Sequence, residues 1–227
     1  MRAPNPAGGR RKSCPKVNEW RHVNGVTATP IWRAFNFVTD HTMRVPPAEA
    51  PVVSRARTLA ADILSVDPAL HEHTSRTARR AAELAQRIPG NRATDVVAAA
   101  WLHDIGYAPR LRRTGFHPLD GALFLMAEEW PERIVRLVAH HCLAVLEAPF
   151  YGVGHHLGVI EVVTGIDADI LVSADLSAGA GNPVPTAQAR LEAMRLADEE
   201  VGLVPDDVRE ARYAGLRAAH ARIESLI

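Results

Sequence analysis

Helical periodicity dominates the sequence from residue 52 to the end of the 227-residue chain. Apolar residues recur there at spacings of three and four, and no stretch alternates apolar and polar residues for long enough to predict a strand. Glycine and proline divide the region into segments of ordinary helix length. Helices are predicted at residues 52–65, 68–88, 95–106, 117–130, 131–148, 167–181, 185–202 and 205–227. The pattern therefore predicts an all-α fold.

Composition is compatible with one helical domain and argues against two classes of partner. Apolar residues make up 47% of the chain, which is enough for a sizeable core. The formal net charge is zero, so no overall positive field attracts nucleic acid. The longest apolar run, "VVAAAWL", is far too short to span a bilayer. We therefore expect neither a membrane nor a nucleic-acid partner.

Residues 1–46 differ in composition from the rest of the chain. They carry eight basic residues against two acidic ones and are rich in proline and glycine near the start. No apolar period is present in "MRAPNPAGGRRKSCPK", so a disordered basic extension is predicted. It is interpreted either as an extension without function or as a misplaced start, with Met43 as the alternative. A basic arm that binds nucleic acid is the less favoured interpretation of this segment. "PPAEAP" at 46–51 then leads into a single domain, residues 47–227.

Two cysteines, Cys14 and Cys142, are the whole thiol content of the chain. They lie far apart, and Cys14 falls in the predicted extension, so no structural disulfide is expected. The N-terminus has no charged segment followed by an apolar leader. Both observations favour a cytoplasmic protein.

One histidine lies on the apolar face of the helix predicted at 68–88. His73 shares this face with Thr77, Ala81 and Leu84, at spacings of three and four. A core histidine bonded to a backbone carbonyl is the ordinary explanation, and a metal ligand is the alternative.

The dipeptide His103-Asp104 ends the alanine-rich helix predicted at 95–106. Adjacent helical residues point about 100° apart, so one pocket holds both only at a helix end or a distorted turn. Burying the carboxylate is costly unless it meets a cation or is fully hydrogen-bonded. A metal ion is the partner that suits both side chains.

Further histidines and an aspartate lie on helices or helix ends with apolar surroundings. His117 begins one predicted helix, His140-His141 lie within the next, and Asp175 is set in the apolar run "ILVSADLSA". Each has an ordinary explanation: a helix cap for His117, surface positions for the two adjacent histidines, and a salt bridge for Asp175. If the chain has no metal site, all of these separate explanations must be true at the same time.

The order His73, His103-Asp104, Asp175 on successive helices resembles the HD superfamily of metal-dependent phosphohydrolases, which is named for that dipeptide. The likeness extends over roughly residues 53–200. It is carried by "HTSRTARRAAELA", "AAWLHDIGY", "HPLDGALFL", "IVRLVAHH" and "DILVSADLSAG". The resemblance implies a single HD-type helical bundle domain.

It also implies a ligand set for metal. His73, His103, Asp104 and Asp175 would bind one ion. In the binuclear subset, His117 and one of His140 and His141 would hold a second ion, with Asp104 bridging. His140 fits the spacing slightly better, and the choice between the two stays open. The cofactor is then one or two divalent transition-metal ions, and this donor set suits Mn, Fe, Co, Ni or Zn. Iron or manganese would be favoured at a binuclear site.

A divalent metal lowers the pKa of bound water, to as low as roughly 7, which gives a hydroxide nucleophile at neutral pH. Arg76, next to His73 on the helix surface, is the first candidate for a cation that contacts the phosphate. The arginines of the loop "APRLRRTGF" are a second candidate, although a solvated loop is preferred. Asp120 could move protons, but a surface position is favoured. His155 and His156 lie in a predicted glycine-flanked loop and are expected to be surface residues.

The function predicted from these residues is hydrolysis of a phosphoester by a metal-bound hydroxide. The substrate would be a nucleotide or another small phosphorylated metabolite, so the enzyme would be a phosphomonoesterase or a phosphodiesterase. Two alternatives remain: a ligand-sensing HD module without turnover, and a di-iron oxygenase of the same superfamily. A homo-oligomer is compatible with the sequence, which does not specify the oligomeric state.

Overall fold

The computed structural model describes residues 50–178 and 186–227. The chain divides into two units, Met1–Met43 and Arg44–Ile227, and every described residue belongs to the second unit. The predicted extension at 1–46, with its alternative start at Met43, therefore lies outside the described residues. The same holds for the end of the helix predicted at 167–181.

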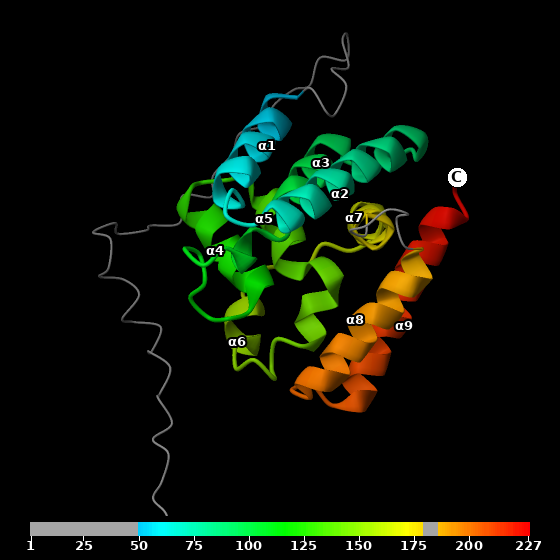
Figure 1. Cartoon of the computed structure of the whole chain (residues 1–227). Coiled ribbons are helices and arrows are strands. Elements are labelled where there is room, and N and C mark those ends of the chain that lie inside the picture. The colour runs from blue at the N-terminus through cyan, green and yellow to red at the C-terminus, as the bar shows by residue number, and fades with distance from the viewer. Residues whose placement is uncertain (1–49, 179–185) are drawn as a thin grey trace, which may run out of the picture. The chain divides into compact units, whose positions relative to one another are not determined.

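The described residues form helices joined by turns and contain no strand, which confirms the all-α prediction (Figure 1). The α-helices of this part of the chain are α1 (Pro51–Ile63), α2 (Pro68–Arg87), α3 (Ala93–Leu102), α4 (His117–Ala127), α5 (Glu132–His140), α6 (Gly154–Leu157), α7 (Ile166–Ser177), α8 (Ala187–Val201) and α9 (Asp206–Glu224). Two short 3-10 helices accompany them, η3 (Ile105–Tyr107) and η4 (His141–Leu146). No helix of the described residues is long and apolar enough to cross a membrane.

Local chemistry explains where two of these helices begin. The side chain of Asp67 accepts a hydrogen bond from the backbone N–H of Leu70 at 3.0 Å, and Pro68 follows in the first turn of α2. Thr186 caps α8 in the same way, because its hydroxyl oxygen accepts from the N–H of Ala189 at 3.2 Å. These caps fix the starts of the two helices that carry His73 and, as shown below, Arg190.

Helix α3 lies at the centre of the main core. Its residues 96–100 are all buried, and it packs against α1, α2, α5 and α7. The small alanine side chains of this stretch let four helices approach one short segment. The C-terminal end of α3, where His103 and Asp104 follow, is therefore surrounded by protein.

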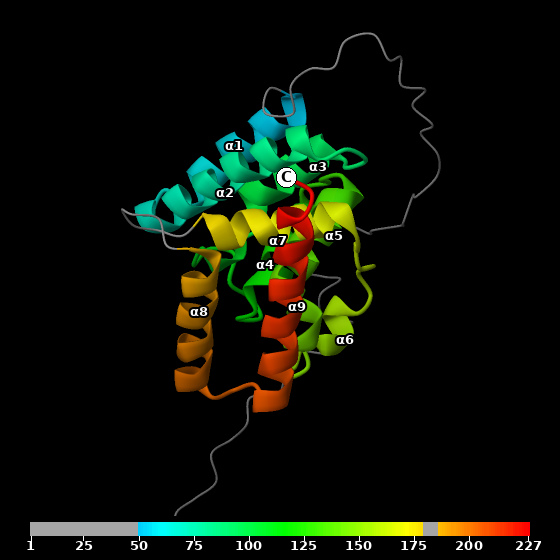
Figure 2. The ribbon, with the colours of Figure 1, turned by 90° about the vertical axis from the view of Figure 1, so that its right-hand side faces the viewer.

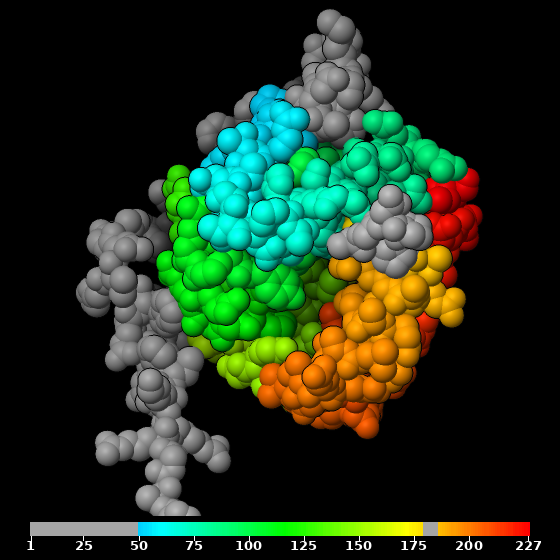
Figure 3. All heavy atoms as spheres, in the orientation of Figure 1, coloured from blue at the N-terminus to red at the C-terminus, as the bar shows by residue number. Residues whose placement is uncertain are grey.

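The last two helices build a second, smaller core on α7. They contribute to an apolar cluster formed by Val172, Leu176, Leu191, Tyr213, Leu216 and Ala219. In Figure 2, α8 and α9 run side by side away from α7. This arrangement leaves a hollow in the surface between α4 and α8 (Figure 3).

Two predictions of local structure were wrong. The helix predicted at 131–148 ends at His140, because Cys142 and Leu143 adopt left-handed backbone angles with φ of 53° and 57°. Such angles are costly for residues with a Cβ and must be stabilised by the surroundings. Here the Nε–H group of Arg212, on α9, donates to the carbonyl of Cys142 at 2.9 Å. The stretch predicted as a loop around His155 contains the short helix α6.

Candidate metal centre

His73 points from α2 toward α7 and is 5% exposed. Its Nδ1 is 3.0 Å from the carbonyl oxygen of Ala178, so Nδ1 carries the proton and Nε2 presents its lone pair. That Nε2 lies 2.9 Å from Oδ1 of Asp175. The ordinary explanation, a backbone-bonded core histidine, therefore accounts for only one of the two ring nitrogens.

His103 and Asp104 occupy the turn between α3 and η3, where the α-helical geometry ends. The Nδ1 of His103 lies 2.9 Å from the carbonyl oxygen of Ala100, which directs Nε2 away from the helix. This Nε2 is 3.2 Å from Oδ2 of Asp104 and 3.7 Å from Oδ1 of Asp175. This nitrogen is fully buried and has no hydrogen-bond partner among the described residues. A buried ring nitrogen of this kind calls for a cation or a proton.

Asp104 faces a different group of ligand atoms with each of its oxygens. Its Oδ2 is on the side of His73 and His103, 3.7 and 3.2 Å from their Nε2 atoms. Its Oδ1 lies 3.5 Å from Nε2 of His117 and 3.5 Å from Nε2 of His141. The carboxylate thus lies between two groups that could each hold a metal ion, one of His73, His103 and Asp175 and the other of Asp104, His117 and His141.

His117 and His141 approach each other from the starts of α4 and η4. Their Nε2 atoms are 3.1 Å apart, and Nδ1 of His141 is bonded to the carbonyl oxygen of Val138 at 2.6 Å. The ring of Tyr107 stacks on that of His117, with the two centroids 3.8 Å apart. The lone pair on Nε2 of His141 and the Nε2 atom of His117 converge here, beside a carboxylate oxygen.

The structure separates the two adjacent histidines that the sequence left unresolved. The Nε2 of His140 bonds to the carbonyl oxygen of Ile160 at 2.8 Å, and His140 is in neither group of converging ligand atoms. His141 is in the second group. The geometry therefore favours His141 over His140, which the sequence slightly preferred, because α5 ends at His140 and the chain turns before His141. The ligand itself stays a prediction.

Burial and the neighbouring charges act in opposite directions on the central ionisable groups. Burial raises the pKa of Asp104 and of Asp175, but interactions with His103 and with the other neighbouring histidines outweigh it and hold both pKa values well below their usual range. Burial lowers the pKa of His103, and the charge of Asp104 more than compensates, so that this pKa is raised well above its usual value. Burial and the neighbouring His141 lower the pKa of His117 to about 3. The carboxylates are therefore ionised and His117 is neutral at pH 7.

Several side chains near the centre differ from what the sequence suggested. Asp120 is buried, and its carboxylate accepts from the N–H groups of Thr114 and Gly115 at 2.8 and 3.1 Å, so the expected surface position was wrong. Its oxygens stabilise the loop before α4. Arg76 forms an ion pair with Glu72 on its own helix, and its contact with a phosphate stays a prediction.

The loop arginines are exposed. Arg110 forms an ion pair with Asp62, and Arg112 donates to the carbonyl oxygen of Tyr107 at 3.3 Å. Arg113 is exposed as well. His155 is exposed and His156 half-buried, and neither is part of the two ligand groups.

Three residues of the centre were missed by the sequence reasoning. Arg190, on α8, places Nη2 3.2 Å from Oδ1 of Asp175 and 3.2 Å from Nε2 of His73. The thiol of Cys142 donates to Oδ2 of Asp175 at 3.0 Å, and burial raises its pKa, which keeps it protonated. Arg212 holds the left-handed turn at Cys142. Only Cys142 had a sequence signal, its place directly after His140-His141.

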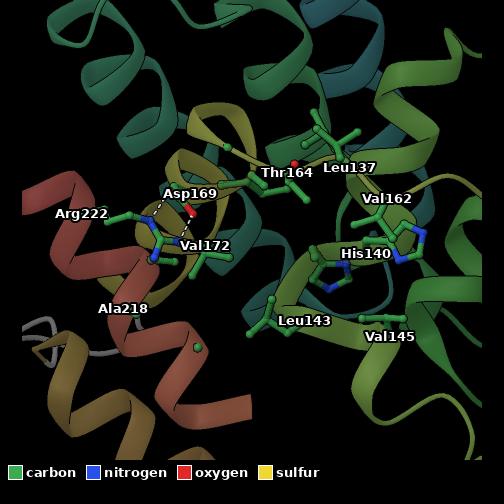
Figure 4. A pocket seen from close by; sticks show the side chains of 17 residues that line it. Leu137, His140, Leu143, Val145, Val162, Thr164, Asp169, Val172, Ala218 and Arg222 are labelled. Carbon is green, nitrogen blue, oxygen red and sulfur yellow. Dashed lines mark hydrogen bonds and ion pairs between the residues drawn. The ribbon is translucent and has the colours of Figure 1, made fainter. Parts of the chain in front are cut away.

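An apolar cavity of about 250 Å³ lies behind His141, between α5, η4, α7 and α9 (Figure 4). Its walls are mostly leucine, valine and alanine, and its two charged residues, Asp169 and Arg222, pair with each other at 2.6 Å. In Figure 4, His140 lies across this cavity from Arg222. With its charges paired, the cavity does not suit a phosphate group.

The donor atoms fit a transition-metal ion. They are imidazole nitrogens and carboxylate oxygens without a thiolate, because Cys142 keeps its proton. Such a set suits Mn, Fe, Co, Ni or Zn. The Nδ1 bonds of His73, His103 and His141 to backbone carbonyls fix each ring with Nε2 directed inward, which is the usual outer support of metal-binding histidines.

Comparison with known families agrees with this geometry. Residues 70–177 match the model of the HD domain. The matched segment contains His73, His103, Asp104 and Asp175, together with His117 and His141, whereas Arg190 lies beyond it. No curated protein matches the chain, and no solved structure does. Residues 70–177 therefore carry an HD domain, the domain that defines the HD superfamily of metal-dependent phosphohydrolases.

Proposed function

We propose that this protein is a metal-dependent phosphohydrolase that cleaves a phosphoester of a nucleotide or another small phosphorylated metabolite. The observation that carries the proposal is the position of Asp104 between two groups of ligand atoms, with one oxygen toward each. A carboxylate in this position can bridge two ions. The proposed ligands are His73, His103, Asp104 and Asp175 for one ion, and Asp104, His117 and His141 for the other.

Bound divalent ions would supply Lewis-acid activation of water and neutralise charge that builds on the phosphoryl oxygens. The chain's own groups prepare the site for this chemistry. The backbone carbonyls of Ala100, Ala178 and Val138 fix the ring orientations, and the low pKa values of Asp104 and Asp175 keep both carboxylates ionised. In the reaction, water would attack phosphorus, the bond to the leaving oxygen would break, and an alcohol or a phosphate would depart.

Two other functions use the same fold and are outcomes of the test. A filled ligand set argues against a ligand-sensing module with a degenerate site, because every expected ligand position carries a histidine or an aspartate. A di-iron oxygenase of the same superfamily would use a similar set of donors. Hydrolysis without consumption of oxygen separates the proposal from the second alternative.

The test is elemental analysis of the purified protein, followed by a hydrolysis screen. The screen uses p-nitrophenyl phosphate, bis-p-nitrophenyl phosphate and nucleotides. Asp104→Ala should lose turnover and bind less metal, while the exposed His155→Gln should keep both. Normal turnover in Asp104→Ala would refute the proposal. Absence of metal and of turnover after reconstitution would favour the sensing module.

A further inference from the structure

Arg190 reaches the candidate metal centre from outside the segment that matches the HD domain. It lies in the first turns of α8, and its side chain is 25% exposed. A cation near a helix N-terminus is disfavoured by the helix dipole, which would favour an acidic residue there. The needs of α8 itself therefore do not explain an arginine at this position.

The guanidinium group contacts two of the proposed ligand atoms at once. Nε2 of His73 and Oδ1 of Asp175 are 2.9 Å apart, and Nη2 of Arg190 lies 3.2 Å from each of them. Because Nδ1 of His73 is bonded to the carbonyl oxygen of Ala178, Nε2 of the neutral ring is an acceptor, as is Oδ1 of Asp175. Two acceptors at this separation repel each other unless a cation or a proton lies near both.

A metal ion on His73 and Asp175 would use the same lone pairs as Arg190. Both cations cannot hold these atoms fully, so ion binding would release at least part of the hydrogen bonding of Arg190. A released guanidinium would still lie beside the ion, and the two positive charges would repel each other. An anion between them removes this repulsion. The Nε of Arg190 is already buried without a hydrogen-bond partner, so the side chain has donor capacity left for one.

We propose that Arg190 is the phosphate-binding cation of this site, exchanging its contacts with His73 and Asp175 for the phosphoryl oxygens of the substrate when metal binds. The inference rests on the proposed function and deepens it, because it makes binding of metal and of phosphate interdependent. The planar fork of N–H groups on the Arg190 guanidinium suits two oxygens of a phosphate. The hollow between α4 and α8 in Figure 3 lies between the helices that carry His117 and Arg190.

Arg190→Gln tests the proposal, and Arg195→Gln is the matched control. Arg195 lies on the same helix with a similar exposure of 29%, and it pairs with Glu192 and Glu199 instead of the metal centre. The probes are Mn²⁺ and inorganic phosphate, added to full-length protein that has been stripped with a chelator. Calorimetry measures Mn²⁺ binding with and without phosphate, and phosphate binding to the Mn²⁺-loaded protein.

Arg190→Gln should bind phosphate about tenfold more weakly or worse, the range for losing a hydrogen bond to a charged group. Without phosphate it should bind Mn²⁺ more tightly than the wild type, on the order of tenfold, because the competing cation is gone. Arg190→Lys keeps the charge but not the fork, so it should show an intermediate phosphate affinity. Arg195→Gln should match the wild type in both measurements.

The possible failures are distinguishable. Wild-type protein that binds Mn²⁺ and hydrolyses phosphoesters, with a phosphate affinity unchanged in Arg190→Gln, would overturn this inference alone. A lower melting temperature in Arg190→Gln with unchanged phosphate affinity would also overturn it, because Arg190 would then be purely structural. Wild-type protein that binds none of Mn²⁺, Fe²⁺, Co²⁺, Ni²⁺ and Zn²⁺ would overturn both this inference and the proposed function.

Discussion

Gly106 controls the approach of α4 to the metal centre, and its replacement by alanine gives a prediction that can be worked from distances. A Cβ at this position would lie 2.0 Å from the carbonyl oxygen of His117 and 2.7 Å from the N–H nitrogen of Gly121. Real Cβ atoms do not come closer than 3.0 Å to such atoms, so the start of α4 must move by about 1 Å. The clashing atoms belong to the backbone, which cannot turn aside as a side chain would.

This shift acts directly on a proposed metal ligand. Metal–ligand distances tolerate deviations of only about 0.2 Å, so a shift of about 1 Å separates His117 from an ion shared with Asp104 and His141. Overpacking of this kind also costs about 1–3 kcal/mol of folding free energy. For a domain of this size the melting temperature should fall by roughly 2–12 °C. We expect Gly106→Ala to lose the second ion, keep the first, and lose most of its turnover.

The assay combines metal stoichiometry by elemental analysis with thermal unfolding. Gly121→Ala is the matched control, because Gly121 faces Gly106 across the same contact. A Cβ on Gly121 would meet its nearest neighbours, the backbone nitrogen of Gly106 and Cγ1 of Ile105, at 3.4 Å, which is ordinary contact. Gly106→Ala with the melting temperature and metal content of the wild type would refute the reasoning that this glycine sets the position of His117.

Three further predictions follow from the same geometry. His141→Gln should lower metal content and turnover, while His140→Gln should leave metal content unchanged. Elemental analysis of the two variants checks this, and the reverse result would contradict the proposal of His141 as a metal ligand. Because the pKa of His103 is raised, metal must displace a proton from it, so affinity should fall by about tenfold per pH unit as the pH drops below that pKa. In chelator-treated protein the stabilisation from protonated His103 is present below about pH 6.5 and is lost as the pH rises through the raised pKa. The gain in melting temperature on adding metal should therefore grow with pH. A gain independent of pH would count against the pairing of protonated His103 with Asp104. Arg212→Met should destabilise the fold by about 3 kcal/mol or more, because Glu147 loses a buried ion pair and the carbonyl of Cys142 loses its hydrogen-bond donor. Urea unfolding measures the free energy of unfolding, and a loss below about 1 kcal/mol would mean that the turn at Cys142 does not depend on Arg212.

Local sequence patterns were sufficient to predict the fold class and most of the candidate ligand set. Spacings of three and four placed His73 on a buried helix face, and the helix break after His103 and Asp104 indicated a place where both side chains could face one site. These are local properties, because periodicity and a helix end are fixed by neighbouring residues.

The remaining features of the site depend on contacts between segments that are distant in the sequence. Arg212, on α9, holds the left-handed turn at Cys142, and this turn directs His141 rather than His140 toward Asp104. The close approach of α4 to Gly106 brings His117 to the same carboxylate. Arg190 reaches Asp175 only because α8 packs on α7. No spacing rule along the chain encodes these contacts, since each depends on how helices far apart in sequence pack together.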